Sequence, residues 1–528
     1  MSLTKLSLLT AFLSTAALAL PVAAQTSSTP PTRQVIADLD KPAGPLNTMF
    51  KACVGAGRAN EGLRADWQRQ LAFTRRECGF EYIRMHGLFT DDMGVYREDK
   101  NGRPEYNWQY IDELYDFLQR IGMKPFVELG FMPQALASGN KTIFWWRGNV
   151  ELPKDFSKWE QFIRAFVLHV QERYGVDEVK SWYFEVWNEP NLSGFFNGTQ
   201  ADYFKLYNVT ARAIKGVSPA YRVGGPATAG CAWVPDFINY CASNRVPVDF
   251  ITTHSYAVDQ GFLDEFGVTG TLFSPNPKSI YGEIRQVRDQ IQSSPLPNLE
   301  LHFTEWSSSY TPSDPLHDSY CSASFIVDRC RHAGTAAQSM SYWTFTDIFE
   351  ESAPRWTPFH GGFGLINYQD ILKPSFRAYQ YMNRLGPTEL QCADDNSWIC
   401  RDNHGGIQAL IWDFTRLNQG RTNNQVFYRW DLPSRTNAVV QFELRNVPPG
   451  RYGVAWHRTG YRSDDPYATY LDLGLPAQLT RSQVDYIRAA NPGTPFAESL
   501  VTVGPDRTLR LNWDLRANDL YLLTFTPL

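Results

Sequence analysis

The stretch Trp182-Tyr-Phe-Glu-Val-Trp-Asn-Glu-Pro-Asn191 joins a strand-like apolar run to an acidic residue at the point where the run must stop. Aromatic and β-branched residues are typical of a buried strand. Pro190 cannot donate a hydrogen bond to a neighbouring strand, so the strand is expected to end beside Glu189. Alternation along a strand would place Glu185, Trp187 and Glu189 on one face. We therefore expect Glu189 at the C-terminal end of a strand, with Glu185 deeper on the same face.

Seven further strand-like runs accompany this one, and an amphipathic helical segment follows each of the eight. The runs cover residues 50–55, 82–87, 124–130, 181–188, 222–227, 248–256, 299–306 and 338–347. Eight strand–helix units predict an α/β fold, a closed (β/α)8 TIM barrel over residues 49–385, with its active site at the C-terminal ends of the strands. A doubly wound open sheet would instead need a glycine-rich phosphate turn after its first strand. Cys53-Val-Gly-Ala-Gly-Arg58 lacks the GxGxxG spacing of such a turn.

The pattern changes after Leu385. Residues 407–414, 425–432, 439–446, 452–458 and two runs near the C-terminus alternate apolar and polar residues, with turn signals such as Pro448-Pro-Gly450 between them. Short alternating strands separated by turns predict an accessory C-terminal β-sandwich over residues 386–528. Residues 25–48 form an N-terminal segment that is able to add a strand to this sandwich.

Residues 1–24 resemble a bacterial-type signal peptide. Lys5 gives a positive start, an apolar stretch follows, and Val22-Ala-Ala24 supplies small residues before an expected cut at Gln25. The stretch is too short for a membrane span, and no later segment supplies a long uncharged apolar run. We therefore expect a secreted or periplasmic protein without a membrane anchor. The net charge of −5 argues against nucleic acid as a partner.

The chain has eight cysteines, and export permits disulfides. The turn-like residues 394–397 between Cys392 and Cys400 predict a bridge across a hairpin. The other pairings stay open. No cysteine pair has the spacing of a zinc site, which argues against a metal cluster. The sequence implies no metal or organic cofactor.

A second strand-end glutamate occurs in His302-Phe-Thr-Glu-Trp306, at the end of the seventh run. A lone glutamate at a strand end is ordinarily a solvated loop residue. Two of them on strands four and seven of one barrel are different, because both would lie at its mouth. Cleavage of a glycosidic bond needs two carboxyl groups, one protonated and one ionised, and direct attack on the sugar requires them about 5.5 Å apart. Glu189 and Glu305 are therefore candidate catalytic residues.

Phe184-Glu-Val-Trp-Asn-Glu-Pro-Asn-Leu192 resembles the acid/base signature of glycoside hydrolase family 39, the family of β-xylosidases and α-L-iduronidases. The resemblance covers approximately residues 50–385, and the β-sandwich that follows is also a family trait. The other matching segments, in the same order as in the family, are Cys53-Val-Gly-Ala-Gly-Arg58, Tyr82-Ile-Arg-Met-His-Gly-Leu88, Phe126-Val-Glu-Leu-Gly-Phe-Met-Pro133, Val223-Gly-Gly-Pro-Ala227, Ser341-Tyr-Trp-Thr-Phe345 and His360-Gly-Gly-Phe-Gly-Leu365. This resemblance implies net retention of configuration, with Glu189 as general acid/base and Glu305 as nucleophile.

The resemblance also assigns residues to the sugar pocket. Asn188 matches the residue that binds the hydroxyl next to the anomeric centre. His86, His254, Tyr256, Trp343 and Glu350 match the lining of the terminal sugar pocket, with Glu351 as the alternative to Glu350.

Some of these side chains have structural alternatives. Trp145 or Trp146 would wall the pocket, or pack against a helix. Trp343 could instead belong to the barrel core, and His254 could lie behind the pocket as a buried, hydrogen-bonded histidine. Arg84 is expected to pair with Glu305 or Glu185.

The sequence departs from the family pattern at two places expected beside the pocket. Met85 stands where bacterial β-xylosidases tend to have Gly, and Trp306-Ser307 replaces Tyr-Asn after the nucleophile. The activity that the resemblance implies is a retaining, exo-acting β-xylosidase that releases D-xylose from the non-reducing ends of xylo-oligosaccharides. The alternatives are a relative acting on an arabinosyl, uronosyl or exopolysaccharide substrate, and a non-catalytic carbohydrate-binding protein. The oligomeric state and the linkage preference do not follow from the sequence.

Overall fold

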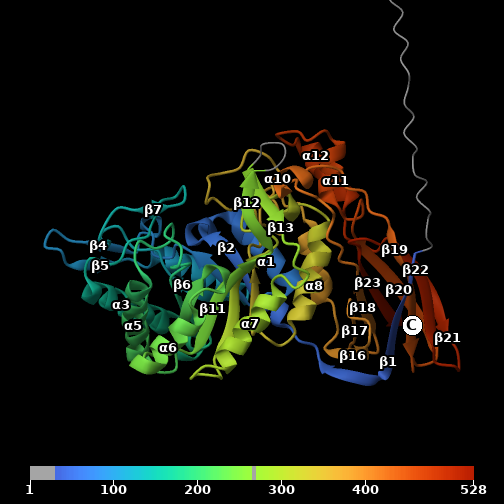
Figure 1. Cartoon of the computed structure of the whole chain (residues 1–528), viewed down its shortest axis with the longest axis horizontal. Coiled ribbons are helices and arrows are strands. Elements are labelled where there is room, and N and C mark those ends of the chain that lie inside the picture. The colour runs from blue at the N-terminus through green and yellow to red at the C-terminus, as the bar shows by residue number, and fades with distance from the viewer. Residues whose placement is uncertain (1–29, 264–268) are drawn as a thin grey trace, which may run out of the picture.

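A closed barrel of eight parallel strands forms the larger part of the molecule (Figure 1). The structure is a computed structural model that describes residues 30–263 and 269–528, so the expected signal peptide lies outside the described residues. Each strand overlaps one predicted run, and β15 closes the barrel on β2 by pairing Tyr342 with Val54. In order around the barrel the strands are β2 (Cys53–Arg58), β3 (Tyr82–His86), β6 (Lys124–Leu129), β9 (Tyr183–Val186), β10 (Arg222–Thr228), β11 (Phe250–Tyr256), β14 (Glu300–Ser307) and β15 (Ser339–Tyr342). The predicted barrel is confirmed.

Helices follow the strands and cover the outside of the barrel. In α3, buried residues recur from Trp159 through Phe162, Ile163 and Phe166, a spacing that puts them on one helical face. The Asp155 side chain caps this helix by accepting hydrogen bonds from the first-turn N–H groups. The covering helices are α1 (Ala65–Cys78), α2 (Gln109–Arg120), α3 (Phe156–Tyr174), α5 (Gln200–Val217), α6 (Val234–Asn244), α7 (Tyr281–Gln292), α8 (Cys321–Ala333) and α9 (Pro374–Asn383).

Strand β9 ends earlier than the sequence indicated. It stops at Val186, and Trp187 and Glu189 have φ angles of 72° and 44°. Trp187 therefore leaves the inner face on which strand alternation would have placed it. Its indole packs against Phe131 and Phe196 in the loops above the barrel. The left-handed backbone costs free energy, and the burial of Trp187 offsets it while Glu189 turns into the mouth.

The second unit is one continuous sheet of nine strands, drawn in orange and red in Figure 1 with β1 in blue. Strand β1 (Thr32–Pro45) runs antiparallel to β16 and parallel to β19. The others, in chain order, are β16 (Thr388–Cys392), β17 (Ser397–Arg401), β18 (Ile407–Trp412), β19 (Thr436–Arg445), β20 (Gly450–Thr459), β21 (Ala497–Val503), β22 (Leu509–Arg516) and β23 (Leu520–Pro527).

This sheet coils over its own core. Phe442 of β19 stacks on Phe525 of β23, with ring centroids 5.8 Å apart, although four strands separate β19 from β23 in the sheet. Trp456 of β20 likewise meets Trp513 of the edge strand β22 at 5.3 Å. The two halves of the sheet therefore face each other, which is the predicted sandwich built from a single sheet.

One predicted strand of the second unit is wrong. Residues 425–432 form no strand, and α10 (Asn424–Phe427) occupies the start of this segment. The side-chain oxygens of Asn424 and Gln425 accept N–H groups of β13 (Thr269–Phe273), the partner of β12 (Val258–Leu263) in a hairpin on the barrel. This contact with the barrel decides the local structure, in place of the strand that the alternation of apolar and polar residues predicted. Two helices that were not predicted, α11 (Pro466–Asp472) and α12 (Arg481–Ala490), lie between β20 and β21.

All eight cysteines lie in the described residues, and all eight thiols are unpaired, so the predicted hairpin bridge is wrong. Strands β16 and β17 do form a hairpin, but its register sets Cys400 opposite Glu389. Cys392 is three residues further along β16, about 10 Å away at the usual rise per residue. That separation exceeds the reach of a disulfide.

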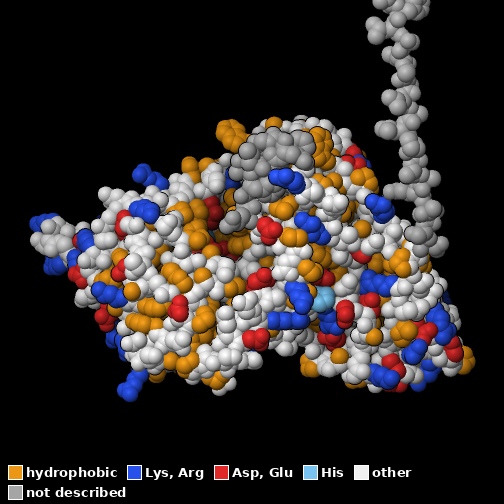
Figure 2. Space-filling model, viewed as in Figure 1, with side chains coloured by type: hydrophobic (Ala, Val, Ile, Leu, Met, Phe, Trp, Pro, Cys, Tyr) orange, Lys and Arg blue, Asp and Glu red, His pale blue; other side chains and the backbone are white. Residues whose placement is uncertain are grey.

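The barrel and the coiled sheet share one hydrophobic core. Trp398, Trp412 and Leu522 of the sheet belong to the same buried cluster as the barrel helices. Arg331 of α8 adds an ion pair with Glu389 at 2.6 Å. On the face shown in Figure 2, acidic and basic side chains are interspersed over both units. No described helix has the length and apolarity that a bilayer crossing requires.

Candidate active site

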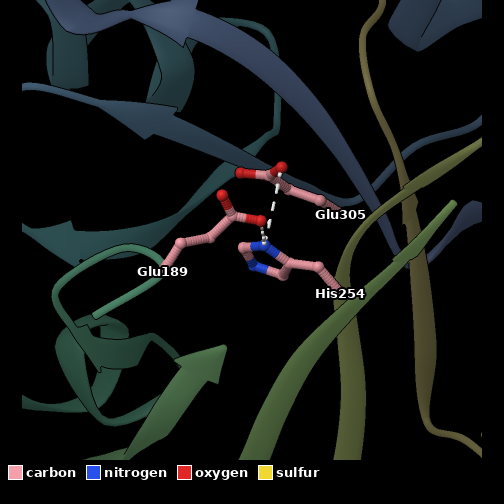
Figure 3. Close-up of side chains that lie close together, drawn as sticks. All are labelled: Glu189, His254 and Glu305. Carbon is pink, nitrogen blue, oxygen red and sulfur yellow. Dashed lines mark hydrogen bonds and ion pairs between the residues drawn. The ribbon is translucent and has the colours of Figure 1, made fainter. Parts of the chain in front are cut away.

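Glu189 and Glu305 meet at the C-terminal mouth of the barrel, as their strand positions predicted. The loop after β9 supplies Glu189 and β14 supplies Glu305, and a carboxylate oxygen of each lies within 4.8 Å of the other. Both residues are buried, with 7% and 4% of their surface exposed. The two side chains converge from opposite sides with His254 of β11 beneath them (Figure 3). This separation suits direct attack on a sugar and is short of the roughly 6.5–9.5 Å at which a water fits between two carboxyl groups.

Glu305 is held by two hydrogen-bond donors. The Arg84 guanidinium donates to Oε1 at 2.8 Å and the Tyr256 hydroxyl donates to Oε2 at 2.7 Å. An ionised carboxylate only accepts hydrogen bonds, so a donor on each oxygen fits the ionised form. The two donors also fix the direction in which the carboxylate points.

Arg84 contacts both Glu305 and Glu185, the two partners between which the sequence did not decide. Besides Glu305 it reaches Glu185 at 2.5 Å, and it donates to Asn188 Oδ1 at 2.8 Å. The Nδ2 group of Asn188 is buried and has no hydrogen-bond partner among the described residues. An unpaired buried donor beside the two glutamates is suited to a hydroxyl of a bound sugar.

Burial raises the pKa of Glu189 to about 7; the charge of Glu128 raises it further and that of Arg84 lowers it. Glu189 therefore keeps its proton close to neutral pH. Its Oε1 lies 2.9 Å from Nδ1 of His254. Burial lowers the pKa of His254 to about 4, so this imidazole is neutral.

His86 lies on the other side of Glu305. Its Nε2 is 3.5 Å from Glu305 Oε1, and its Nδ1 is 2.6 Å from Glu128. Burial lowers the pKa of His86 to about 3 and raises that of Glu128 to about 8. The Trp343 ring packs against His86 with centroids 4.7 Å apart, which makes it a wall of this site.

Of the two neighbouring glutamates after β15, Glu351 and not Glu350 turns toward the site. Glu350 is taken up by ion pairs with Arg58 at 2.7 Å and Arg64 at 2.9 Å. Glu351 lies 3.7 Å from His86 Nε2, and burial together with the nearby Glu305 raises its pKa well above the ordinary value. The expectation for Glu350 is therefore corrected. The arginines that decide the direction of its side chain lie about 290 residues away in the sequence.

The expected wall tryptophan is part of an aromatic run at residues 144–146. Trp145 is 55% exposed, and its backbone N–H donates to the carbonyl of Glu351, so it lies beside the site at the surface. Phe144 stacks on His86, with centroids 6.0 Å apart. The sequence reasoning missed Phe144 and Glu128. A charge inside the apolar strand β6 was the signal that could have found Glu128.

The two departures from the family pattern lie away from the pair of glutamates. Met85 and Trp306 belong to the buried core, and Trp306 packs against Phe325 of α8 outside the strands. Ser307 bonds to the carbonyl of Ser309. Neither departure contacts Glu305, whose polar partners are Arg84 and Tyr256.

Glu189, His254 and Glu305 are also the one group of described residues with three potential metal ligands close together. The Arg84 guanidinium already lies against Glu305, and Nδ1 of His254 is engaged with Glu189. A fixed positive charge at this distance opposes a cation. The donor set therefore fits a metal poorly.

Two buried carboxyl groups at this spacing, on strands four and seven of a closed (β/α)8 barrel, define a retaining glycoside hydrolase. Residues 33–504 match the model of glycosyl hydrolases family 39. The chain belongs to this family, as its signature sequence indicated.

The similar proteins cover nearly the whole chain. The β-xylosidase of Caldicellulosiruptor saccharolyticus is 44% identical over 457 residues, which cover 85% of this chain and 89% of that protein. The β-xylosidase of Geobacillus stearothermophilus is 38% identical over 482 residues, which cover 90% of this chain and 92% of that protein. The crystal structure of a monomeric β-xylosidase from Caulobacter crescentus CB15 has a TM-score of 0.91 and 45% identity, with 94% of this chain and 100% of that chain covered.

Proposed function

We propose that this protein is an exo-acting β-xylosidase that releases D-xylose from the non-reducing ends of xylo-oligosaccharides with retention of configuration. The observation that carries the proposal is the pairing of Glu189, which burial keeps protonated, with Glu305, both of whose oxygens accept hydrogen bonds. Relatives named β-xylosidases, similar over 85–90% of the chain, support the choice of sugar.

In the first step an oxygen of Glu305 attacks the anomeric carbon while the bond to the leaving oxygen breaks. Glu189 gives its proton to that oxygen. Arg84 and Tyr256 hold the attacking carboxylate in line, which reduces the entropy lost on reaching the transition state. The products of this step are a glycosyl ester on Glu305 and the shortened oligosaccharide.

In the second step water attacks the same carbon while the bond from that carbon to Glu305 breaks, which returns Glu305 to its carboxylate form, and Glu189, now ionised, accepts the proton of the water. Formation of the ester removes the negative charge of Glu305, while Glu189 becomes negative. Microscopic reversibility makes the acid of the first step the base of the second. Xylose is released with the configuration it had in the substrate.

The charges around the site favour a neutral sugar over a uronic acid. Arg84, the cation inside the barrel, already bonds to Glu185, Asn188 and Glu305. Glu351 adds a further acidic group beside His86. The cation that lies against both catalytic partners inside the barrel is therefore already engaged and is not free for a sugar carboxylate.

Two variants test the assignment of roles. Glu305→Ala is expected to abolish turnover even of an activated aryl xyloside, because no nucleophile remains. Glu189→Ala is expected to slow substrates with poor leaving groups far more than activated ones, and azide is expected to restore part of the rate. Steady-state kinetics on xylobiose and on an aryl xyloside measure both effects.

Glu350→Ala is a matched control, since Glu350 faces Arg58 and Arg64 and does not face Glu189 or Glu305. It is expected to keep the leaving-group dependence of the unmodified enzyme. Equal loss on both substrates in Glu189→Ala, with no effect of azide, would assign the acid/base role elsewhere. Product stereochemistry followed by NMR checks retention, and a panel of aryl glycosides checks the sugar.

We also propose that the protein is exported through cleavage of residues 1–24. The support is the charge and apolar pattern of that segment. N-terminal sequencing of the protein recovered outside the cytoplasm is expected to begin at Gln25. Recovery of the intact N-terminus in the cytoplasm alone would refute the proposal.

A further inference from the structure

A chain of hydrogen bonds inside the barrel connects Glu185 of β9 with Glu189. Thr304 of β14 donates to Glu185 Oε1 at 2.8 Å, and its hydroxyl oxygen lies 3.1 Å from Nε2 of His254. Nδ1 of His254 lies 2.9 Å from Glu189 Oε1. Glu185, Thr304 and His254 are fully buried, so bulk water does not compete for these contacts.

The direction of the hydrogen bond between Thr304 and Glu185 decides the direction of the other two hydrogen bonds in this chain. Both oxygens of Glu185 are acceptors, since Arg84 donates to Oε2 and Thr304 donates to Oε1. A hydroxyl has a single proton, so toward His254 the Thr304 oxygen acts only as an acceptor. A neutral imidazole carries one N–H, which must then lie on Nε2. Nδ1 is left as an acceptor facing Glu189.

We infer that Thr304 is a positioning residue for the reaction, which selects the His254 tautomer whose unprotonated Nδ1 accepts a hydrogen bond from the protonated carboxyl group of Glu189. The inference rests on the proposed function, because it takes Glu189 as the acid/base. No covalent bond changes, and Thr304 touches neither the substrate nor the reacting carboxyl group.

This tautomer of His254 favours protonated Glu189 over ionised Glu189, both before and after the proton goes to the leaving group. While Glu189 is an acid, its O–H donates to Nδ1 of His254. Once the proton has gone to the leaving group, Nδ1 has no hydrogen to give to the carboxylate. A carboxylate without that donor is a stronger base, which helps it to take a proton from the attacking water. The opposite tautomer would stabilise ionised Glu189, so that less of it is protonated near neutral pH for the first step and its carboxylate is a weaker base in the second.

Other charged or titratable groups face Glu189 and His254 from every element around them. They are Arg84 and His86 of β3, Glu128 of β6, Glu185 of β9, Tyr256 of β11, Glu305 of β14 and Glu351 of the loop after β15. A substitution of Thr304 removes none of these charges. It does remove a hydrogen-bond donor from Glu185 as well, so the tautomer of His254 is also measured directly.

Thr304→Val tests the inference by removing the hydroxyl at almost constant shape. Nε2 of His254 then loses its acceptor, and the proton moves to Nδ1, where carboxylates accept it. The alkaline limb of the kcat/KM profile is expected to move down by about one pH unit, because a donor to ionised Glu189 lowers its pKa. The rate on xylobiose is expected to fall by roughly tenfold or more, and that on an activated aryl xyloside by less. Thr304→Ser is expected to restore the position of the limb.

Thr253→Val is the matched structural control. Thr253 is also fully buried in the barrel wall, and its hydroxyl donates to the carbonyl of Thr228. It is expected to lower the melting temperature to a similar extent, with the alkaline limb unmoved. Equal limb shifts in the two valine variants, or no shift in Thr304→Val, would overturn the inference.

A measurement on the unmodified protein needs neither a folded variant nor turnover. Nitrogen-15 NMR of labelled histidine is expected to show His254 protonated on Nε2 alone, with its signals assigned by their loss in His254→Asn. Protonation on Nδ1, or on both nitrogens near neutral pH, would refute the inference. Failure of the proposed function looks different: the Nε2–H tautomer would be present in a protein that does not hydrolyse xylosides.

Discussion

At the scale of single residues, burial and hydrogen bonding give two chemically identical side chains different roles. Glu189 and Glu305 are both strand-end glutamates, but their partners differ. Arg84 and Tyr256 donate hydrogen bonds to the two oxygens of Glu305, whereas Glu189 faces the acceptor nitrogen of His254. Identical carboxyl groups in unlike surroundings are how one site holds an acid and a nucleophile together.

The pH profile follows from the pKa of Glu189. Because burial raises it to about 7 and the first step needs the protonated form, kcat/KM is expected to fall as the pH rises through about 7. The sign is that of an essential acid: activity is complete below this pKa and lost above it. Measurement of kcat/KM for xylobiose from pH 4 to pH 10 checks this. A profile that stays flat to pH 9 would contradict the role of Glu189.

The sequence identified both glutamates and most of their neighbours, since each lies in or just after a strand whose position in the barrel was predictable. It did not separate Glu350 from Glu351. The two are adjacent in a loop, and the choice between them is made by Arg58 and Arg64, which belong to the first barrel unit. No local pattern contains that information.

At the scale of elements, close contact between strands β2 and β15 shapes the site. A Cβ atom on Gly55 would lie 2.5 Å from the ring of Trp343, closer than real contacts allow. Glycine in β2 therefore lets the Trp343 ring lie beside His86 at the wall of the site. Elsewhere the absence of a side chain in a strand is a weakness, but here it makes room for the indole.

Gly55→Ala is expected to displace Trp343, raise KM for xylobiose and destabilise the fold by about 1–3 kcal/mol, the usual range for overpacking. Thermal unfolding and steady-state kinetics measure the two effects. Gly453→Ala in β20 is the control, because its nearest neighbours would lie 3.9 Å away or further. A Gly55→Ala enzyme with unchanged KM would show that the position of Trp343 does not matter for binding.

Element prediction succeeded where a continuous apolar run reflects a parallel strand that is buried on both faces. All eight barrel strands are such cases. It failed at residues 425–432, where Asn424 and Gln425 bind the β12–β13 hairpin, and at Trp187, where the strand ends early. In both places a contact with a distant segment outweighs the periodicity of the sequence.

At the scale of the whole molecule, the coiled sheet braces the barrel. Trp398 and Trp412 lie in one buried cluster with the barrel helices, and the indole N–H of Trp412 donates to Asp328 of α8. Strand β1 lies inside the sheet and is joined to the first barrel strand by a short segment with one 3-10 turn at Met49–Lys51. The chain therefore passes between the two units twice, once before the first barrel strand and once after the last barrel helix.

We expect the two units to unfold together. Separation would expose the tryptophans of the shared core to water, which opposes independent unfolding. Differential scanning calorimetry of the full chain is expected to show one transition with equal calorimetric and van't Hoff enthalpies. Two resolved transitions would show instead that the contact between barrel and sheet contributes little to stability.

The sequence by itself determined the barrel, the two glutamates at its mouth and the family, because each depends on short patterns and on strand order. Only the tertiary structure decided which neighbouring carboxyl group faces the site, how Arg84 is shared, and where the single proton of Thr304 points. The cysteines and the coiling of the nine-stranded sheet were settled at that level too. For the carboxyl groups, Arg84 and Thr304 the physical reason is the same. The direction of a side chain depends on partners that lie hundreds of residues away in the sequence and meet only when the barrel closes.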